Sequence, residues 1–309
     1  MRILAVAALA SVMLACRSGD RTIVVDGTRT MPPPPAMTPE VRADREAKLA
    51  AARAAVDRDP ADLDARIWLG RREAYLGLYG KSIETFSAGL ALAVSRGDLG
   101  FEARFLRHRG HRYITVRAFD SAIADLERAA ALLPRVPDEV EPDGLPNARN
   151  VPTSTLHTNV TYHLGLALFL SGRFDAAADA YRACVAASAN PDMLCAATHW
   201  LYMTLRRLGR AAEAARALDP IRADMDVIEN RSYLGLCLAY SGEIAPESLL
   251  DEARRGGGID FATAGFGVGH LRLVSGDRDG ARSLFSEIVA AAEPAAFGFI
   301  AAEAELARD

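Results

Sequence analysis

Residues 161–184 read TYHLGLALFLSGRFDAAADAYRAC, and this segment carries a clear helical pattern. Gly165 lies within a first apolar segment, Gly172 interrupts the chain, and Ala177 and Tyr181 lie one helical turn apart in a second segment. Residues three or four positions apart share one face of a helix. A glycine after a helix supplies a left-handed turn, and a small residue within a helix lets a neighbouring helix come close. The stretch therefore predicts two antiparallel helices with a tight turn at Gly172.

The same order recurs along the chain, so that six segments share it. The other five contain Leu69, Gly70, Gly77 and Phe86; Gly110, Ala122 and Leu126; Leu201, Gly209, Ala214 and Leu218; Leu234, Gly235 and Gly242; and Gly269, Gly276, Ala281 and Phe285. Repeated hairpins bury their apolar faces by stacking on one another. The pattern departs at Tyr202, which stands where glycine is expected, and it fades after Pro246.

This pattern resembles the tetratricopeptide repeat (TPR) family over roughly residues 62–291. The resemblance implies an all-α, right-handed superhelical solenoid of antiparallel helix pairs, with about six repeats. Thr38 and Pro39 form a typical helix start and predict a capping helix over 39–58. A second capping helix is expected over 294–308, because the ends of a solenoid need a polar outer face.

One interval breaks the period. Gly110 and Gly165 are 55 residues apart, whereas a TPR spans about 34. The excess is residues 134–155, PRVPDEVEPDGLPNARNVPTST, called the insert below. Its prolines indicate a stiffened loop, and loops of this length are usually functional or disordered. We expect its acids to fold onto the arginines of the preceding repeat; the alternative is a solvated connector. The acids are Asp138, Glu139, Glu141 and Asp143.

The N-terminal residues have the features of an export signal. Residues 1–15 combine Arg2 with a short apolar run, which predicts a signal peptide. Ala15 before Cys16 resembles a bacterial lipoprotein signal, which implies a lipidated Cys16 and an outer-membrane location facing the periplasm or the cell surface. Residues 16–37 would form the anchor and a proline-rich linker, followed by a folded body over 38–309. The alternative is plain secretion.

By the TPR resemblance, the first helix of each pair lines a concave groove. The groove positions carry arginines, histidines, an asparagine and aromatic residues, which suits an anionic ligand. The candidate ligand-binding residues are Arg104, Arg107, His108, His111, Asn159, Tyr162, His163, His199, Trp200 and Arg206. The alternative is a polar face whose histidines are satisfied by packing.

Other kinds of site find little support. A net charge of −4 argues against general nucleic-acid binding. No zinc-protease, P-loop, serine-hydrolase or EF-hand motif occurs, so no catalytic residue, cofactor or metal is predicted. The spacing of His108 and His111 suits two metal ligands, but no carboxylate accompanies them. Cys184 and Cys195 flank a hairpin turn and leave a disulfide open, although packed helices usually lie too far apart.

The sequence is compatible with three functions. The first is an exported, lipid-anchored scaffold that binds a peptide, a protein or an anionic envelope ligand in its groove. The second is an envelope enzyme whose His- and Arg-lined pocket is closed by the insert. The third is a structural lipoprotein that uses its convex face. An open channel along several repeats would favour the scaffold, and a closed pocket of histidines and carboxylates would favour the enzyme.

Overall fold

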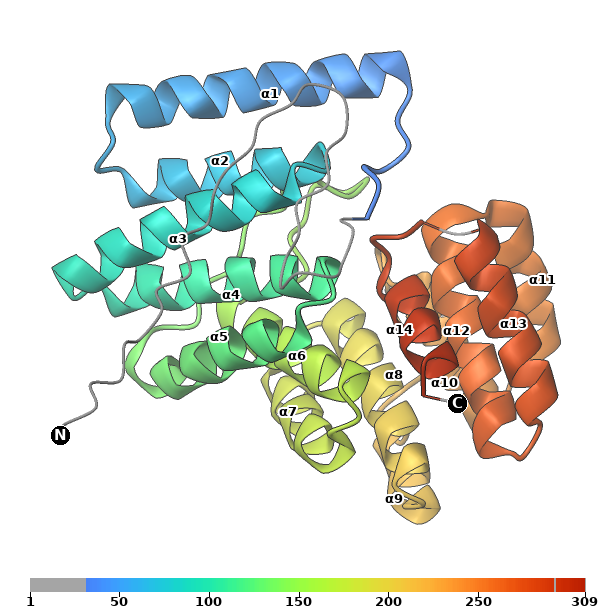
Figure 1. Cartoon of the computed structure of the whole chain (residues 1–309). Helices are drawn as coiled ribbons and strands as arrows, with labels where there is room; N and C mark the ends of the chain where they lie inside the picture. The colour runs from blue at the N-terminus through green and yellow to red at the C-terminus, as the bar shows by residue number, and fades with distance from the viewer. Residues whose placement is uncertain (1–31, 292, 309) are drawn as a thin grey trace, which may run out of the picture. The chain divides into compact units, whose positions relative to one another are not determined.

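The computed structural model describes residues 32–291 and 293–308, so the predicted signal peptide and Cys16 lie outside the described residues. Within these ranges the chain is all-α, with fourteen α-helices, one 3₁₀ turn and no strand beyond an isolated bridge (Figure 1). The elements are α1 (Pro39–Arg58), α2 (Leu63–Tyr75), α3 (Tyr79–Arg96), α4 (Leu99–Thr115), α5 (Phe119–Leu132), η1 (Leu133–Arg135), α6 (Leu156–Leu170), α7 (Phe174–Ala187), α8 (Pro191–Arg207), α9 (Ala211–Ala217), α10 (Arg231–Ser241), α11 (Pro246–Gly256), α12 (Gly258–Val274), α13 (Arg278–Ala291) and α14 (Phe297–Leu306). No described helix has the length and apolarity that a membrane span requires.

The helices pack in antiparallel pairs that follow the chain, from α2 with α3 to α12 with α13. This arrangement confirms the predicted all-α, TPR-like fold. The predicted first capping helix has the bounds of α1, and the Thr38 hydroxyl accepts a hydrogen bond from the Val41 amide at 3.3 Å. The second capping helix, α14, is shorter than predicted, at Phe297–Leu306.

Close helix contacts occur where the pattern places them. Four of the repeat glycines face a large side chain sixteen residues later on the paired helix, and an added Cβ would lie 2.3–2.8 Å from that side chain, whereas Gly235 faces Leu249, fourteen residues later, at 2.9 Å. The pairs are Gly70 with Phe86, Gly110 with Leu126, Gly165 with Tyr181, and Gly269 with Phe285. Only glycine leaves room for the partner ring or branched chain, so these contacts set the spacing within each hairpin.

The hairpin turns also repeat. A residue with positive φ lies seven positions after the helix glycine, for example Gly77 (φ 75°) and Gly172 (φ 76°). In the second repeat this place is taken by Arg117, with φ 62°. Its side chain forms an ion pair with Glu303 of α14 and donates to the Pro294 carbonyl at 2.9 Å. A strained backbone position therefore carries a contact to the C-terminal helix.

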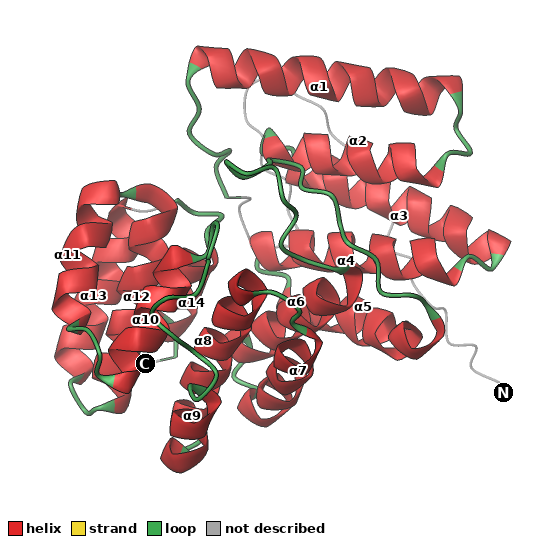
Figure 2. Cartoon of the chain, turned by 180° about the vertical axis from the view of Figure 1, so that it is seen from behind, coloured by secondary structure: helices red, strands yellow, loops and turns green. Residues whose placement is uncertain are grey.

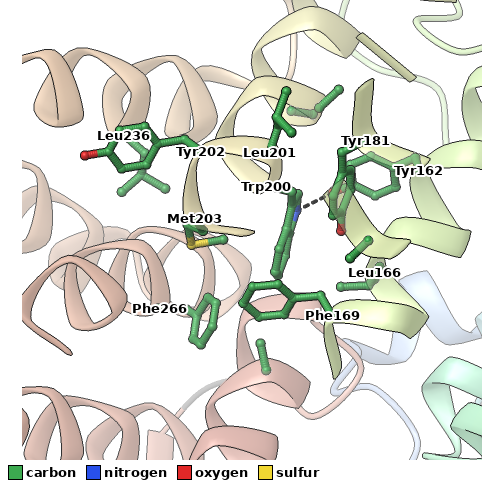
Figure 3. Close-up of a cluster of buried hydrophobic side chains, with 14 of the residues drawn as sticks. Tyr162, Leu166, Phe169, Tyr181, Trp200, Leu201, Tyr202, Met203, Leu236 and Phe266 are labelled. Atoms are coloured by element: carbon green, nitrogen blue, oxygen red, sulfur yellow. Dashed lines mark hydrogen bonds between the residues drawn. The ribbon is translucent and has the colours of Figure 1, made fainter. Parts of the chain in front are cut away.

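The largest core cluster surrounds Trp200 (Figure 3). The Trp200 indole is 1% exposed and donates through Nε1 to the Tyr162 hydroxyl at 2.9 Å. The rings of Phe169 and Phe266 lie 5.3 and 5.8 Å from it. Helices α6, α8 and α12 thereby share one core.

The described cysteines are free, buried thiols, so the disulfide left open between Cys184 and Cys195 is not formed. The sulfur of Cys184 lies 3.9 Å from that of Met193, and the sulfur of Cys195 lies 3.9 Å from that of Met225. Burial raises the pKa of both thiols to about 12. Both side chains act as small apolar groups of the core.

Candidate functional site

The insert lies across the first helices of the early repeats. Figure 2 shows the loop that joins α5 to α6 passing over α4 toward α2 and returning. The two limbs of the insert meet at an antiparallel bridge between Val140 and Thr155, and the Glu141 amide donates to the Ser154 carbonyl at 3.0 Å. The insert is thus an ordered hairpin-like excursion over the face on which the groove was predicted.

Glu141 is the residue that fixes the insert to this face. Its side chain is 8% exposed and lies 2.7 Å from the Arg107 guanidinium. The side-chain nitrogen Nδ2 of Asn159 donates to the same carboxylate at 2.6 Å, and His108 Nε2 lies 3.9 Å from that carboxylate. Three candidate ligand-binding residues from α4 and α6 therefore meet one carboxylate of the chain itself.

The other candidates around the insert have different roles. Asp138 accepts a hydrogen bond from the His157 amide at 2.9 Å and so caps the start of α6. Arg104 pairs with Asp64 of α2 at 2.9 Å, and the insert does not contact it through an ion pair. Of the four acids expected over the arginines, Glu141 is the one that makes such a pair among the described residues.

Helix α2 holds the main chain of the insert. Arg71 donates to the Pro142 carbonyl at 2.8 Å, and Arg72 donates to the Gly144 carbonyl at 2.9 Å. Both guanidinium groups stack over the Trp68 ring, at 4.4 and 4.9 Å. Two arginines on an aromatic platform thus bind a peptide backbone irrespective of its side chains.

Trp68 and Arg71 were missed from the sequence, although a signal for them exists. They stand two residues before and one residue after Gly70, as His108 and His111 stand relative to Gly110. Extending the groove positions to the first repeat would have identified them.

The tip of the insert is held at a second place. Arg149 pairs with Asp226 at 2.7 Å, and Asn147 donates to Glu229 at 3.3 Å. Both acids belong to the loop before α10. This loop is fixed by Asp192, a 1% exposed carboxylate that accepts from the backbone amides of residues 228, 229 and 230 at 2.8–3.2 Å.

Helix α14 covers a second group of predicted groove residues. The rings of His111 and His163 lie 4.4 Å apart, and Phe297 lies 5.3 and 5.7 Å from them. Burial lowers the pKa of His163 to about 3, although its Nδ1 is hydrogen-bonded to the Asn159 carbonyl at 2.6 Å. These imidazoles are neutral packing groups, and a ligand would reach them only if α14 moved.

Most candidates of the later repeats lie in the core. Tyr162 and Trp200 are 6% and 1% exposed, and His199 is hydrogen-bonded to the Tyr240 hydroxyl at 3.0 Å. Burial lowers the pKa of His199 to about 3. Arg206 donates to the Tyr202 hydroxyl at 2.7 Å. Tyr162, Trp200 and His199 are thus enclosed by packing and Arg206 is half-buried, so the arginine-rich face of α2 and α4, which the insert covers, is the remaining candidate site.

The arginines on the face of α2 and α4 carry more positive charge than the nearby carboxylates neutralise. Burial lowers the pKa of Arg107, and Glu141 opposes this effect. Burial also lowers the pKa of Arg112 to about 10; its guanidinium lies 6.0 Å from the centre of the Tyr79 ring, and no carboxylate of the described residues lies within 4.0 Å of it. Buried charges without counter-ions are unfavourable, so this face has capacity for additional anionic groups.

Within the described residues, the insert and α14 cover the predicted groove positions of α4 and α6, so these helices do not present an open channel. A pocket of about 320 Å³ lies elsewhere, between α13 and α14, and includes Leu273, Arg278, Phe285 and Glu305. In the described ranges, no three His, Cys, Asp or Glu side chains are placed to hold a metal ion.

No protein-family model and no curated protein matches the chain. Similar solved structures include MamA AMB-1, with 20% identity over 58% of this chain and 88% of that one, at a TM-score of 0.41. A second is YrrB, described as a TPR protein with an unusual peptide-binding site, with 14% identity over 83% of this chain and 98% of that one, at a TM-score of 0.44. A third is a kinesin light chain protein of Podosopora anserina with nearly identical TPR-like repeats, with 15% identity over 75% of this chain and 95% of that one, at a TM-score of 0.44. At these identities the likeness concerns the fold alone.

Proposed function

We propose that this protein is a scaffold that binds an extended polypeptide segment of a partner across the first helices α2, α4 and α6. One observation carries the proposal: a segment of the chain itself is bound there in this way. Arg71 and Arg72 bind its main-chain carbonyls, and Arg107 with Asn159 binds one carboxylate. A partner segment would find the same donors.

The chemistry of the face indicates what kind of segment fits. Carbonyl recognition is independent of sequence, so it selects for an extended backbone. The guanidinium groups select for acidic side chains, because Arg binds carboxylates through charge-assisted hydrogen bonds. The Trp68 ring holds Arg71 and Arg72 in place by cation–π contacts.

A crosslinking experiment tests this function. A photoreactive residue in place of Val140, the exposed neighbour of Glu141, should crosslink a partner polypeptide in cells, and the same residue at the exposed Val94 of α3 serves as the control site. The crosslink should disappear when Arg71 and Arg107 are both changed to Ala, and should persist with Arg182→Ala on α7. Identical crosslinks from both sites, or crosslinks that survive the double change, would contradict the proposal.

We also propose that the protein is exported and anchored to the outer membrane through lipid on Cys16. The apolar run before Cys16 and the small side chain of Ala15 support export and lipidation. Growth with a clickable palmitate analogue should label the wild-type chain and leave a Cys16→Ser variant unlabelled. A wild-type chain that stays unlabelled would refute lipidation.

A further inference from the structure

We propose that the insert is a tethered competitor, which an acidic extended segment of a partner displaces by placing its own carboxylate where Glu141 lies. The inference rests on the proposed function and adds to it the chemistry of the partner and the way in which the partner gains access.

The first support is the way in which the insert is held. Between residues 137 and 152, only Glu141 and Gly144 are buried. The large apolar side chains of this segment face solvent: Val140, Leu145 and Val151 are 62%, 52% and 48% exposed. Apolar burial is the main force that holds a segment permanently in place. The middle of the insert lacks it and depends on polar contacts, which a second polypeptide can exchange one for one.

The second support is the incomplete fit of Glu141. Its Oε1 atom and the Arg107 Nε atom are both buried without a hydrogen-bond partner. The Arg107 Nη1 atom is used by His108, at 2.8 Å from Nδ1. The ion pair therefore rests on one short contact between Nη2 and Oε2, at 2.7 Å. A carboxylate that is free to orient can engage a guanidinium at two points, which is the stronger arrangement.

The third support is the charge that the insert leaves unpaired. Among the described residues, Glu141 is the one carboxylate within 4.0 Å of the guanidinium groups of Arg71, Arg107 and Arg112. A partner segment with two acidic side chains would replace Glu141 at Arg107 and pair with Arg112 as well. The competitor thus binds less well than the ligand that it resembles, as displacement requires.

The insert itself provides the probe. A fluorescein-labelled synthetic peptide of residues 136–151, VPDEVEPDGLPNARNV, is titrated with the full chain in detergent, and fluorescence anisotropy reports binding. Because the tethered insert reduces the fraction of open face, the wild-type chain should bind the peptide weakly. A Glu141→Gln chain should bind it about tenfold more tightly, since apparent affinity scales with the open fraction. Glu139→Gln, the same change at an exposed position of the loop, should match wild type.

The outcomes separate the two proposals. Peptide binding that is equal for the wild-type and Glu141→Gln chains would overturn the competitor while leaving the binding face intact. Absence of binding to every chain would contradict the proposed function as well. Arg107→Ala should abolish binding, and a peptide with Glu141→Gln should bind more weakly than the unmodified peptide.

A second measurement uses the wild-type chain and does not depend on the folding of a variant. Arg149 is the one basic residue between positions 136 and 155, so trypsin reports on the insert there. An oligoglutamate peptide should accelerate cleavage after Arg149 several-fold by displacing the insert, and an uncharged oligoglutamine peptide, which trypsin does not cleave, should not. A cleavage rate that oligoglutamate leaves unchanged would overturn the proposal.

Discussion

Arg117 offers a test of how backbone strain and a tertiary contact balance in this fold. It occupies the left-handed turn position that other repeats fill with glycine, at φ 62°. A residue with a Cβ in this conformation costs about 1 kcal/mol relative to glycine. Its guanidinium lies 2.8 and 2.6 Å from Glu303 and 2.9 Å from the Pro294 carbonyl oxygen. We expect the contact to outweigh the strain.

The magnitudes follow from exposure. The side chains of Arg117 and Glu303 are 16% and 37% exposed, so solvent screens the pair in part, and it should contribute about 1–2 kcal/mol. Arg117→Ala loses this contact and keeps the strain, so we expect the full loss of about 1–2 kcal/mol. Arg117→Gly loses the contact and relieves the strain, so it should be about 1 kcal/mol more stable than the alanine variant.

Urea denaturation followed by far-UV circular dichroism would give the free energies, and hydrogen exchange in α14 would localise the effect. A double-mutant cycle with Glu303→Ala isolates the ion pair from other changes. Equal stability of the Ala and Gly variants would show that a side chain at position 117 does not strain the backbone. An alanine variant as stable as wild type would show that the contacts of Arg117 with Glu303 and Pro294 do not stabilise the fold.

Three further outcomes are expected. Gly165→Ala should destabilise the fold by about 1–3 kcal/mol in urea melts, because its Cβ would lie 2.8 Å from Tyr181; Tyr181→Leu in the same chain should recover part of the loss. Since burial raises the pKa of Cys184 to about 12, iodoacetamide at pH 8 should modify it only after unfolding, as mass spectrometry would show; fast modification of the folded chain would contradict this. The folded pKa values of His163 and His199, about 3, lie below the unfolded value near 6.5, so the unfolded chain binds more protons in that window. Stability should therefore fall as pH drops from about 6.5 toward 3, by up to about 1.4 kcal/mol per pH unit for each histidine; a urea midpoint equal at pH 7.5 and 5.5 would count against it.

The hairpins could be predicted because their determinants are local. Gly165 and Tyr181 are sixteen residues apart, and the helical period alone places them on facing helices. The start of α1 follows equally from Thr38 and Pro39, which satisfy the first turn. Arg117 shows the limit of such rules: a non-glycine residue takes the turn conformation where a distant contact, 186 residues away at Glu303, holds it.

The occupancy of the groove could be predicted only in part. The acids of the insert and the arginines of α4 were both visible, so their approach was expected, but which acid would meet Arg107 depends on how the loop folds. The cover by α14 was not foreseen, because no local pattern relates Phe297 to His111. Asp192 was missed for the same reason: its three amide partners lie in a loop with no repeat signature.

The histidines explain why polar residues on a groove face were a poor guide to solvent access. A neutral imidazole is a flat ring that packs like an aromatic side chain once burial has removed its charge. His108 stacks on Phe86 at 5.4 Å, and His199 stacks on Tyr240 at 5.7 Å. An arginine at these places would keep its charge and demand a counter-ion. Of the predicted groove positions, Arg107 retains such a demand, and Arg112, which was not among them, has it as well. These two arginines, rather than the histidines, are the residues that we propose for an acidic partner.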